Sequence, residues 1–252
     1  MSLSPRDWHN RFSQQARWTQ DLRRHLFSRA GVDRAARILD VGCGTGVLQR
    51  ELDQIGYSRA YGLDIEPRFL SEAQHVSPSR RYVLGDAHSL PYSKGSFDLT
   101  FCHFLLLWVE DPALVIKEMH RVTRPGGALM VLAEPDYGGR IDYPPGLVSL
   151  GKLQADALRA QGADPEMGRR LADLLSELEL EKLETGVLGA QWSGLPPPDE
   201  FESEWSVIRS DLGDKLSKEQ LDRLQEMDTR AWEHGARVLF VPTFFAWGKV
   251  PG

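Results

Sequence analysis

A short glycine-rich stretch, residues 40–46 with the sequence DVGCGTG, is the feature that most limits how this chain can fold. It follows an apolar run, Ile38–Val41, and precedes Leu48, Leu52 and Ile55, which are spaced as on one face of a helix. Glycines let the backbone turn sharply and approach a ligand, and a helix that follows presents its N-terminal N–H groups. The stretch therefore predicts a strand, a ligand-binding turn and a helix.

The same alternation of strand and helix continues along the first half of the chain. Apolar or alternating runs bounded by Gly, Pro and Asp predict the strands, and helix-spaced apolar residues predict the helices between them. Five such alternations favour an α/β fold, a doubly wound parallel sheet with helices on both faces. The expected strands are residues 38–41, 60–63, 82–84, 97–101 and 128–133.

The pattern changes after Glu134. A loop rich in Pro, Gly and Tyr is followed by helical stretches and a strand at 183–188, and residues 199–235 predict two amphipathic helices. The final apolar run, 238–247, predicts one strand. Pro242 inside it is awkward because proline cannot donate a ladder hydrogen bond. Residues 8–26 predict an amphipathic helix before the first strand.

Composition narrows the function classes. The chain has 252 residues and a formal net charge of −6, so no overall basic field attracts nucleic acid or anionic lipid. Two cysteines, Cys43 and Cys102, cannot form a disulfide framework, a four-thiolate zinc site or an iron–sulfur site, and no metal is expected. With no signal peptide and no apolar run long enough for a membrane, we expect a cytoplasmic protein that binds neither membrane nor nucleic acid.

Acidic residues follow the next two predicted strands. Asp64 lies at the end of the second strand, 18 residues after Gly46, where a carboxylate can accept hydrogen bonds from both hydroxyls of a ribose. Asp86 ends the third strand, in position to meet a purine amino group, with the Ala87 amide beside it. The glycine turn, Asp64 and Asp86 together predict a nucleoside-containing ligand at the strand ends.

Four blocks of sequence are similar to the class I S-adenosylmethionine-dependent methyltransferases. In order they are ILDVGCGTG (38–46), YGLDIEP (61–67), YVLGDAHSLPYSKGSFDLTFCHFLLLWVEDP (82–112) and EMHRVTRPGGALMVLAEP (118–135). The resemblance implies a Rossmann-like sheet of seven strands with the last one reversed, and S-adenosyl-L-methionine bound across the strand ends. It also implies transfer of the cofactor's methyl group to a nucleophile.

The resemblance also assigns site residues. It places the glycine turn at the methionine part of the cofactor, Asp64 at the ribose, Ile65 at the adenine face, and Asp86 with Ala87 at the adenine edge. An N-terminal segment often covers the cofactor in this family, so Trp18 is a candidate cover and Arg17 a candidate partner of the methionine carboxylate. The expected cofactor-binding set is Arg17, Trp18, Asp40, Gly42, Cys43, Gly44, Gly46, Asp64, Ile65, Asp86, Ala87 and Cys102.

The acceptor side is less defined. His103, just after the fourth strand, is the candidate general base, needed only if the acceptor arrives protonated. Glu134, Asp136 and Tyr137 follow the fifth strand and are candidates for the pocket rim. Each assignment has an alternative. His103 can be a histidine that only packs, and Trp18 can belong to the core. Glu134, Asp136 and Tyr137 can belong to an ordinary solvated loop.

These patterns predict a single domain over 1–252. Its parts are an N-terminal helical cover (1–36), a cofactor-binding core (37–134), helical cap insertions (135–182 and 195–237) and the last strands (183–194 and 238–252). The expected function is methyl transfer to a small-molecule acceptor by in-line displacement, in a monomer or homodimer. A noncatalytic S-adenosylmethionine sensor or scaffold remains open. An NAD-dependent oxidoreductase fits less well because its fingerprint needs a glycine where Val47 stands.

Overall fold

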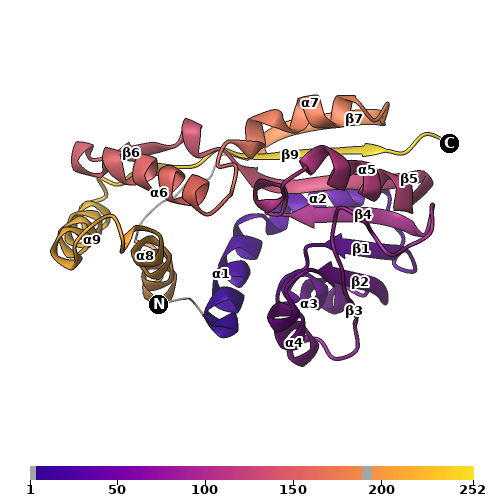
Figure 1. Cartoon of the computed structure of the whole chain (residues 1–252), viewed down its shortest axis with the longest axis horizontal. Coiled ribbons are helices and arrows are strands. Elements are labelled where there is room, and N and C mark those ends of the chain that lie inside the picture. The colour runs from indigo at the N-terminus through magenta and orange to yellow at the C-terminus, as the bar shows by residue number, and fades with distance from the viewer. Residues whose placement is uncertain (1–3, 189–194) are drawn as a thin grey trace.

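The computed structural model describes residues 4–188 and 195–252 (Figure 1). A seven-stranded sheet runs through it in the order β3-β2-β1-β4-β5-β9-β7. Neighbouring strands from β3 to β5 are parallel, and β9 is antiparallel to both β5 and β7. This confirms the Rossmann-like fold with a reversed last strand. The strands are β1 (Arg37–Val41), β2 (Arg59–Asp64), β3 (Arg81–Leu84), β4 (Phe97–His103), β5 (Thr123–Pro135), β7 (Glu181–Leu188) and β9 (Thr243–Lys249).

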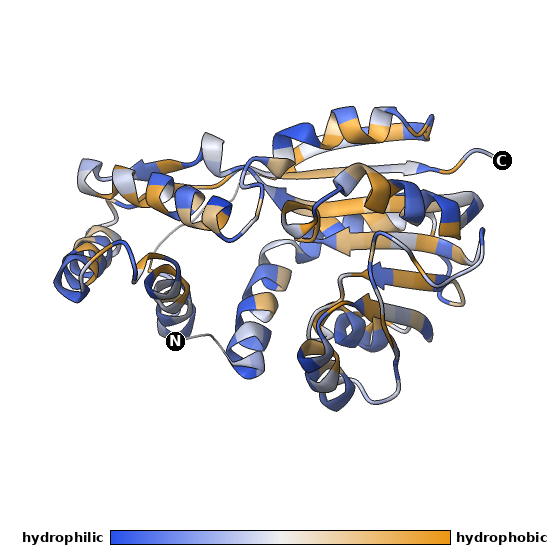
Figure 2. Ribbon diagram, viewed as in Figure 1, coloured by the Kyte–Doolittle hydropathy of each residue, from blue (hydrophilic) through white to orange (hydrophobic). Residues whose placement is uncertain are grey.

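Both faces of the sheet are buried because its strands are apolar at successive positions. In β1, Leu39 and Val41 join one apolar cluster and Ile38 joins the other. Helices α5 (Pro112–Val122) and α7 (Leu171–Ser176) pack on the first face, and α2 (Gln20–Ala30) and α3 (Val47–Gln54) on the second. Figure 2 shows hydrophobic colour on the central strands and blue on the outward helix surfaces. A further helix, α4 (Pro67–Val76), joins β2 to β3.

A helical cap stands beside one end of the sheet (Figure 1). It has its own apolar cluster, which includes Trp205, Ile208 and Leu212 and is separate from the two clusters on the sheet. The cap consists of β6 (Ile141–Tyr143), α6 (Val148–Ala160), α8 (Pro198–Leu212), α9 (Lys218–Glu233) and β8 (Val238–Phe240). Short 3-10 turns complete the described chain: η1 (Leu106–Trp108), η2 (Tyr137–Gly139), η3 (Pro145–Leu147) and η4 (Met167–Arg170).

Two elements differ from the sequence-based expectation. The final run is two strands, since β8 pairs with β6 in the cap and β9 enters the large sheet, with Pro242 between them. The N-terminal helix is also divided, into α1 (Pro5–Trp18) and α2, at Thr19. The Thr19 hydroxyl hydrogen-bonds back to the carbonyls of Gln15 and Ala16, an arrangement that often bends helices.

The predicted domain parts overlap residues outside the described chain at two places. These are residues 1–3 of the expected N-terminal cover and residues 189–194 of the expected strand region, of which β7 is the described part. Within the described residues, no helix combines the length and apolar character that crossing a membrane requires.

Candidate functional site

The glycine turn lies at the carboxyl end of β1, where the sequence predicts it. Gly42 and Gly44 have φ of +74° and +53°, in the left-handed region that favours glycine. The Gly42 and Cys43 amides donate to the Leu63 carbonyl at 2.8 and 2.9 Å, which fixes the turn against β2. Gly46 is the N-cap of α3, and no described side chain caps that end of the helix. The turn therefore presents backbone and a helix N-terminus at the strand ends.

Asp64 stands beside this turn at the end of β2. Its Oδ2 accepts a hydrogen bond from the Gly44 amide at 2.7 Å, and its Oδ1 accepts one from the Glu66 amide at 2.9 Å. Burial raises the pKa of Asp64, against the lowering effect of these amides. The next residue, Ile65, is 67% exposed, an unusual position for a large apolar side chain. An exposed apolar side chain beside a carboxylate suits a ligand with a flat ring and hydroxyl groups.

Asp86 and Ala87 follow β3 at the same end of the sheet. The Asp86 carboxylate is exposed and accepts hydrogen bonds from the His88 amide (2.9 Å) and ring Nδ1 (2.7 Å). These bonds from His88 hold the pKa of Asp86 below its usual value. Ala87 is buried.

Three other predicted cofactor residues have buried side chains. Cys43 and Cys102 lie inside the core, and burial raises the pKa of both thiols well above the usual value, so both stay protonated. Asp40 is buried below the glycine turn, where it accepts a hydrogen bond from Gln49 Nε2 at 3.2 Å. Desolvation raises the pKa of Asp40 to about 7.

Helix α1 lies over the glycine turn. A Cβ built on Gly44 would come within 3.0 Å of the Phe12 ring, so the ring sits directly against that backbone. The His9 ring is 2.9 Å from Thr45 Oγ1, and Phe12 makes an edge contact with Phe69 of α4. The sequence predicts a covering helix but not these contacts of His9, Phe12 and Phe69. The four-residue spacing of Trp8 and Phe12 was the available signal.

The two α1 residues that were singled out point to the cap. Arg17 donates from Nε and Nη2 to Glu200 Oε1 of α8, at 3.0 and 2.8 Å. The Arg11 guanidinium lies 5.2 Å from the centre of the Trp18 ring. The structure therefore brings Arg17 to α8 and Trp18 to Arg11, and neither is brought to the glycine turn.

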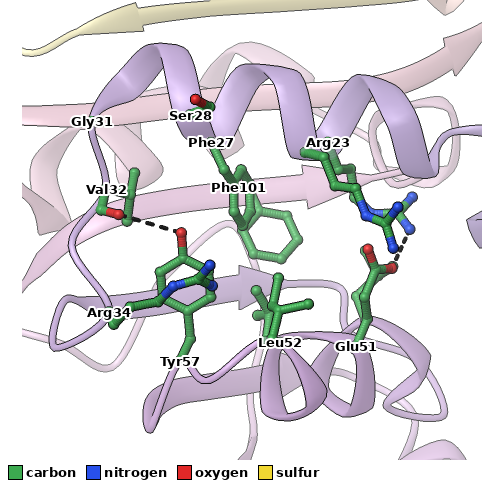
Figure 3. A pocket seen from close by; sticks show the side chains of 13 residues that line it. Arg23, Phe27, Ser28, Gly31, Val32, Arg34, Glu51, Leu52, Tyr57 and Phe101 are labelled. Atoms are coloured by element: carbon green, nitrogen blue, oxygen red, sulfur yellow. Dashed lines mark hydrogen bonds and ion pairs between the residues drawn. The ribbon is translucent and has the colours of Figure 1, made fainter.

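His103, at the end of β4, faces the joint between α1 and α2. Its Nε2 is 2.8 Å from Thr19 Oγ1, which also accepts a hydrogen bond from Arg23. Burial, with a smaller contribution from Arg23, holds the pKa of His103 well below its usual value, so the ring is neutral at pH 7. Figure 3 shows Arg23 paired with Glu51 in the groove between α2 and α3. The role of His103 as a general base stays a prediction.

The groove in Figure 3 has a volume of about 440 Å³. Its lining comes from α2, α3 and neighbouring core residues such as Phe101, and it includes none of the predicted site residues. It is therefore separate from the strand ends where the glycine turn and Asp64 lie.

Of the three candidates expected after the fifth strand, one lines a cavity, and Glu134 lies within β5. Glu134 is buried and accepts hydrogen bonds from the amides of Leu105 (3.0 Å), Leu106 (2.9 Å) and Leu107 (3.2 Å), and desolvation raises its pKa to about 7. Asp136 is also buried and pairs with Arg169 at 2.7 Å. Tyr137 lines a second cavity between α1 and the cap.

This second cavity, the cap pocket, has a volume of about 100 Å³. Its lining residues come from α1, the ends of β4 and β5, and the cap. They are Arg11, Gln14, Gln15, Trp18, Phe104, Pro135, Tyr137, Arg140, Pro196, Glu200, Phe201, Glu204, Asp228, Trp232, Leu239, Val241 and Thr243. Because α1 borders both the glycine turn and this pocket, the two candidate subsites share one helix as a wall. Among the described residues, no cluster of His, Cys, Asp and Glu suits a metal ion.

Residues 39–131 match a family described as "Methyltransferase domain". The chain is 35% identical over 104 residues to a malonyl-[acyl-carrier protein] O-methyltransferase of Pseudescherichia vulneris. The match spans 41% of this chain and 41% of that relative, about two fifths of each.

Two solved structures share the fold at low identity. A phosphoethanolamine N-methyltransferase 2 of Haemonchus contortus, in complex with S-adenosyl-L-methionine, superposes with a TM-score of 0.57 at 14% identity, covering 93% of this chain and 53% of that one. The [4+2]-cyclase SpnF superposes with a TM-score of 0.58 at 20% identity, covering 92% of this chain and 82% of that one.

Proposed function

We propose, from the premise that this chain contains a class I S-adenosylmethionine-dependent methyltransferase domain, that it transfers the cofactor's methyl group to a small molecule held in the cap pocket. The observation that carries the proposal is the glycine turn with Asp64 beside it, at adjoining strand ends within the matched residues 39–131.

The residues present fit this cofactor. In the proposal, the turn at Gly42 and Gly44 receives the methionine part, and Asp64 accepts hydrogen bonds from the ribose hydroxyls. The exposed Ile65 covers one face of the adenine, while Asp86 and the Ala87 amide meet its edge. These positions offer an exposed apolar surface at Ile65, acceptor oxygens at Asp64 and Asp86, and left-handed glycines at the turn, while Ala87 offers its backbone N–H.

The chemistry that the cofactor supplies when bound is an electrophilic methyl group on a sulfonium. The protein's own task is therefore alignment, with the acceptor's nucleophilic atom about 3–3.5 Å from the methyl carbon. In the proposal α1 aligns the two subsites, since Phe12 packs on the glycine turn while Arg11 and Trp18 line the cap pocket.

The acceptor of the relative from Pseudescherichia vulneris cannot be assigned directly to this chain. That relative is named for malonyl-[acyl-carrier protein], but the family match ends at residue 131. Of the residues that line the cap pocket, all but Phe104 lie outside the matched stretch. The acceptor of this chain therefore has to be inferred from the cap pocket itself.

Calorimetry with S-adenosylhomocysteine, the demethylated cofactor, tests the proposal. We expect the wild type to bind, and Asp64→Ala to weaken binding at least tenfold, because a hydrogen bond to a charged group contributes about 1.5–3 kcal/mol. Asp173→Ala, on the exposed surface of α7, is the matched control and leaves the affinity unchanged. Absence of binding by a folded wild type would show that the proposal is wrong.

Transfer is tested separately with methyl-labelled S-adenosylmethionine and a small-molecule extract. The proposal expects label in a small molecule. Binding of the cofactor without any transfer of label would instead favour the noncatalytic sensor or scaffold.

A further inference from the structure

The cap pocket contains many aromatic side chains and little open volume. Five aromatic residues line it, from α1, the ends of β4 and β5, α8 and α9: Trp18, Phe104, Tyr137, Phe201 and Trp232. A volume of about 100 Å³ suits a molecule of about one substituted ring. Shape and lining therefore favour a compact, mostly apolar occupant.

Three of the charged lining residues belong to two ion pairs between α1 and α8. Arg11 pairs with Glu204, and Glu200 pairs with Arg17 at 2.8 Å. Arg11 is almost wholly buried, so its charge is balanced inside the protein rather than by solvent. Neither pair leaves a net charge for a ligand to neutralise.

The remaining charged groups form one buried network in the cap. Arg140 pairs with Asp142 at 2.7 Å, and Arg237 pairs with Asp142 at 2.7 Å and with Asp228 at 2.6 Å. With the two pairs above, four arginines face four carboxylates, so the charges of the lining residues and their partners sum to zero.

Residues near the pocket add no positive charge. Asp211 lies close enough to influence both Arg11 and Tyr137, and it accepts a hydrogen bond from Gln161. A carboxylate in the pocket would therefore meet no unpaired cation from the described residues.

Uncharged polar groups, by contrast, are available in the lining. The Tyr137 hydroxyl, the Gln15 amide and the Trp232 indole N–H make no hydrogen bond with any described residue. They can give or accept hydrogen bonds without a charge on the ligand.

We infer that the cap pocket selects an uncharged, largely apolar acceptor of about one ring, which is held by aromatic packing and by hydrogen bonds to Tyr137, Gln15 and Trp232. The inference rests on the proposed function and specifies its acceptor class. It excludes the free carboxylate of a malonyl-type acceptor, since burial of an unpaired charge is strongly unfavourable.

Three probes with the same ring and methyl group test this class: 4-methylphenol, 4-methylbenzoate and 4-methylbenzylamine, which are neutral, anionic and cationic at pH 7. Each is titrated by calorimetry into the wild type in the presence of S-adenosylhomocysteine. We expect 4-methylphenol to bind at least tenfold tighter than either charged probe. Equal or tighter binding of a charged probe, or no binding of 4-methylphenol, would overturn the inference.

Charge variants test the pairing itself. Glu204→Gln leaves Arg11 unpaired and should raise the affinity for 4-methylbenzoate at least tenfold. Glu226→Gln removes a carboxylate from an exposed pair on α9, 3.0 Å from Arg230, and should change nothing. Tyr137→Phe should weaken 4-methylphenol binding about fivefold. If Glu204→Gln does not fold, the order of affinities of the three probes for the wild type still tests the inference.

The two proposals fail separately. If S-adenosylhomocysteine does not bind but the probe ranking holds, the proposed function is wrong and the pocket chemistry stands. If the cofactor product binds and the ranking fails, only the acceptor class is wrong.

Discussion

Among single residues, Asp40 makes the stability of the folded protein depend on pH. It is buried, and desolvation raises its pKa to about 7, whereas an unfolded chain has an aspartate pKa of about 3.9. Below pH 4 the carboxyl is protonated in both states and costs nothing. Between about pH 4 and 7 the unfolded state releases its proton first, so Asp40 lowers stability as the pH rises, up to a plateau above pH 7.

Asp40→Asn should remove this dependence. Gln49 Nε2 already donates to Asp40, and Gln49 Oε1 is buried with no hydrogen-bond partner among the described residues, so an asparagine amide can donate to it. We expect the free energy of unfolding of the variant, relative to wild type, to rise by roughly 2–3 kcal/mol between pH 5 and pH 8. Urea unfolding at the two pH values measures it, and a constant difference would contradict the account.

Residues whose role depends on local backbone were predictable from the sequence. The glycine turn and Asp64 lie where the strand–turn–helix pattern placed them, because neighbouring residues determine both positions. The partners of Arg17 and His103 were not predictable. Glu200 is 183 residues from Arg17, and Thr19 is 84 residues from His103, so only the folded chain brings them together.

Among the elements, η1 after β4 is held by one buried carboxylate. Glu134 of β5 accepts hydrogen bonds from three consecutive amides, of Leu105, Leu106 and Leu107. The turn therefore stays folded because an acid from the neighbouring strand satisfies donors that would otherwise be buried without partners.

Glu134→Ala should destabilise the protein by about 3–5 kcal/mol, because it leaves three amides unpaired. Glu134→Gln is the matched control. Its remaining oxygen can keep the bonds from Leu105 and Leu106, both of which go to Oε1, so the loss should be smaller. Thermal unfolding compares the two variants, and equal losses would mean that the hydrogen bonds contribute little.

The ends of helices and strands were predictable where a helix-capping residue or a change in apolar spacing marks them. Ser217 and Gln220, spaced in the sequence as a capping box, form that box at the start of α9. The break at Thr19 was missed because apolar spacing continues across it, and the bend depends on the Thr19 hydroxyl. Pro242 was a correct warning sign, but only pairing with β6 shows that the strand divides there.

At the scale of the whole molecule, buried charge holds the elements of the cap together. Arg237 lies between Asp142 and Asp228, and Asp228 also accepts a hydrogen bond from the Trp205 indole at 3.0 Å. Segments 95 residues apart in the chain thus meet at one guanidinium. No local pattern could predict the cap pocket, because its lining is drawn from several distant segments.

Arg237→Met should loosen the cap and leave the sheet intact. Removing one partner of a buried ion pair costs about 3–5 kcal/mol. We expect faster hydrogen exchange in α8 and α9 and unchanged exchange in β1, β4 and β5. Arg230→Met, in an exposed pair on α9, is the control and should leave all five elements unchanged. Equal loss of protection in the sheet would show that cap and sheet unfold as one unit.

The strand order has a consequence for biosynthesis. Residues 243–249 form β9, which lies between β5 and β7, so the last strand in the chain is an interior strand of the sheet. A nascent chain can complete neither this sheet nor its burial of Ala246 and Trp247 until residue 249 has left the ribosome. Until then β5 has an unpaired edge, and an unpaired strand edge is a surface through which chains associate.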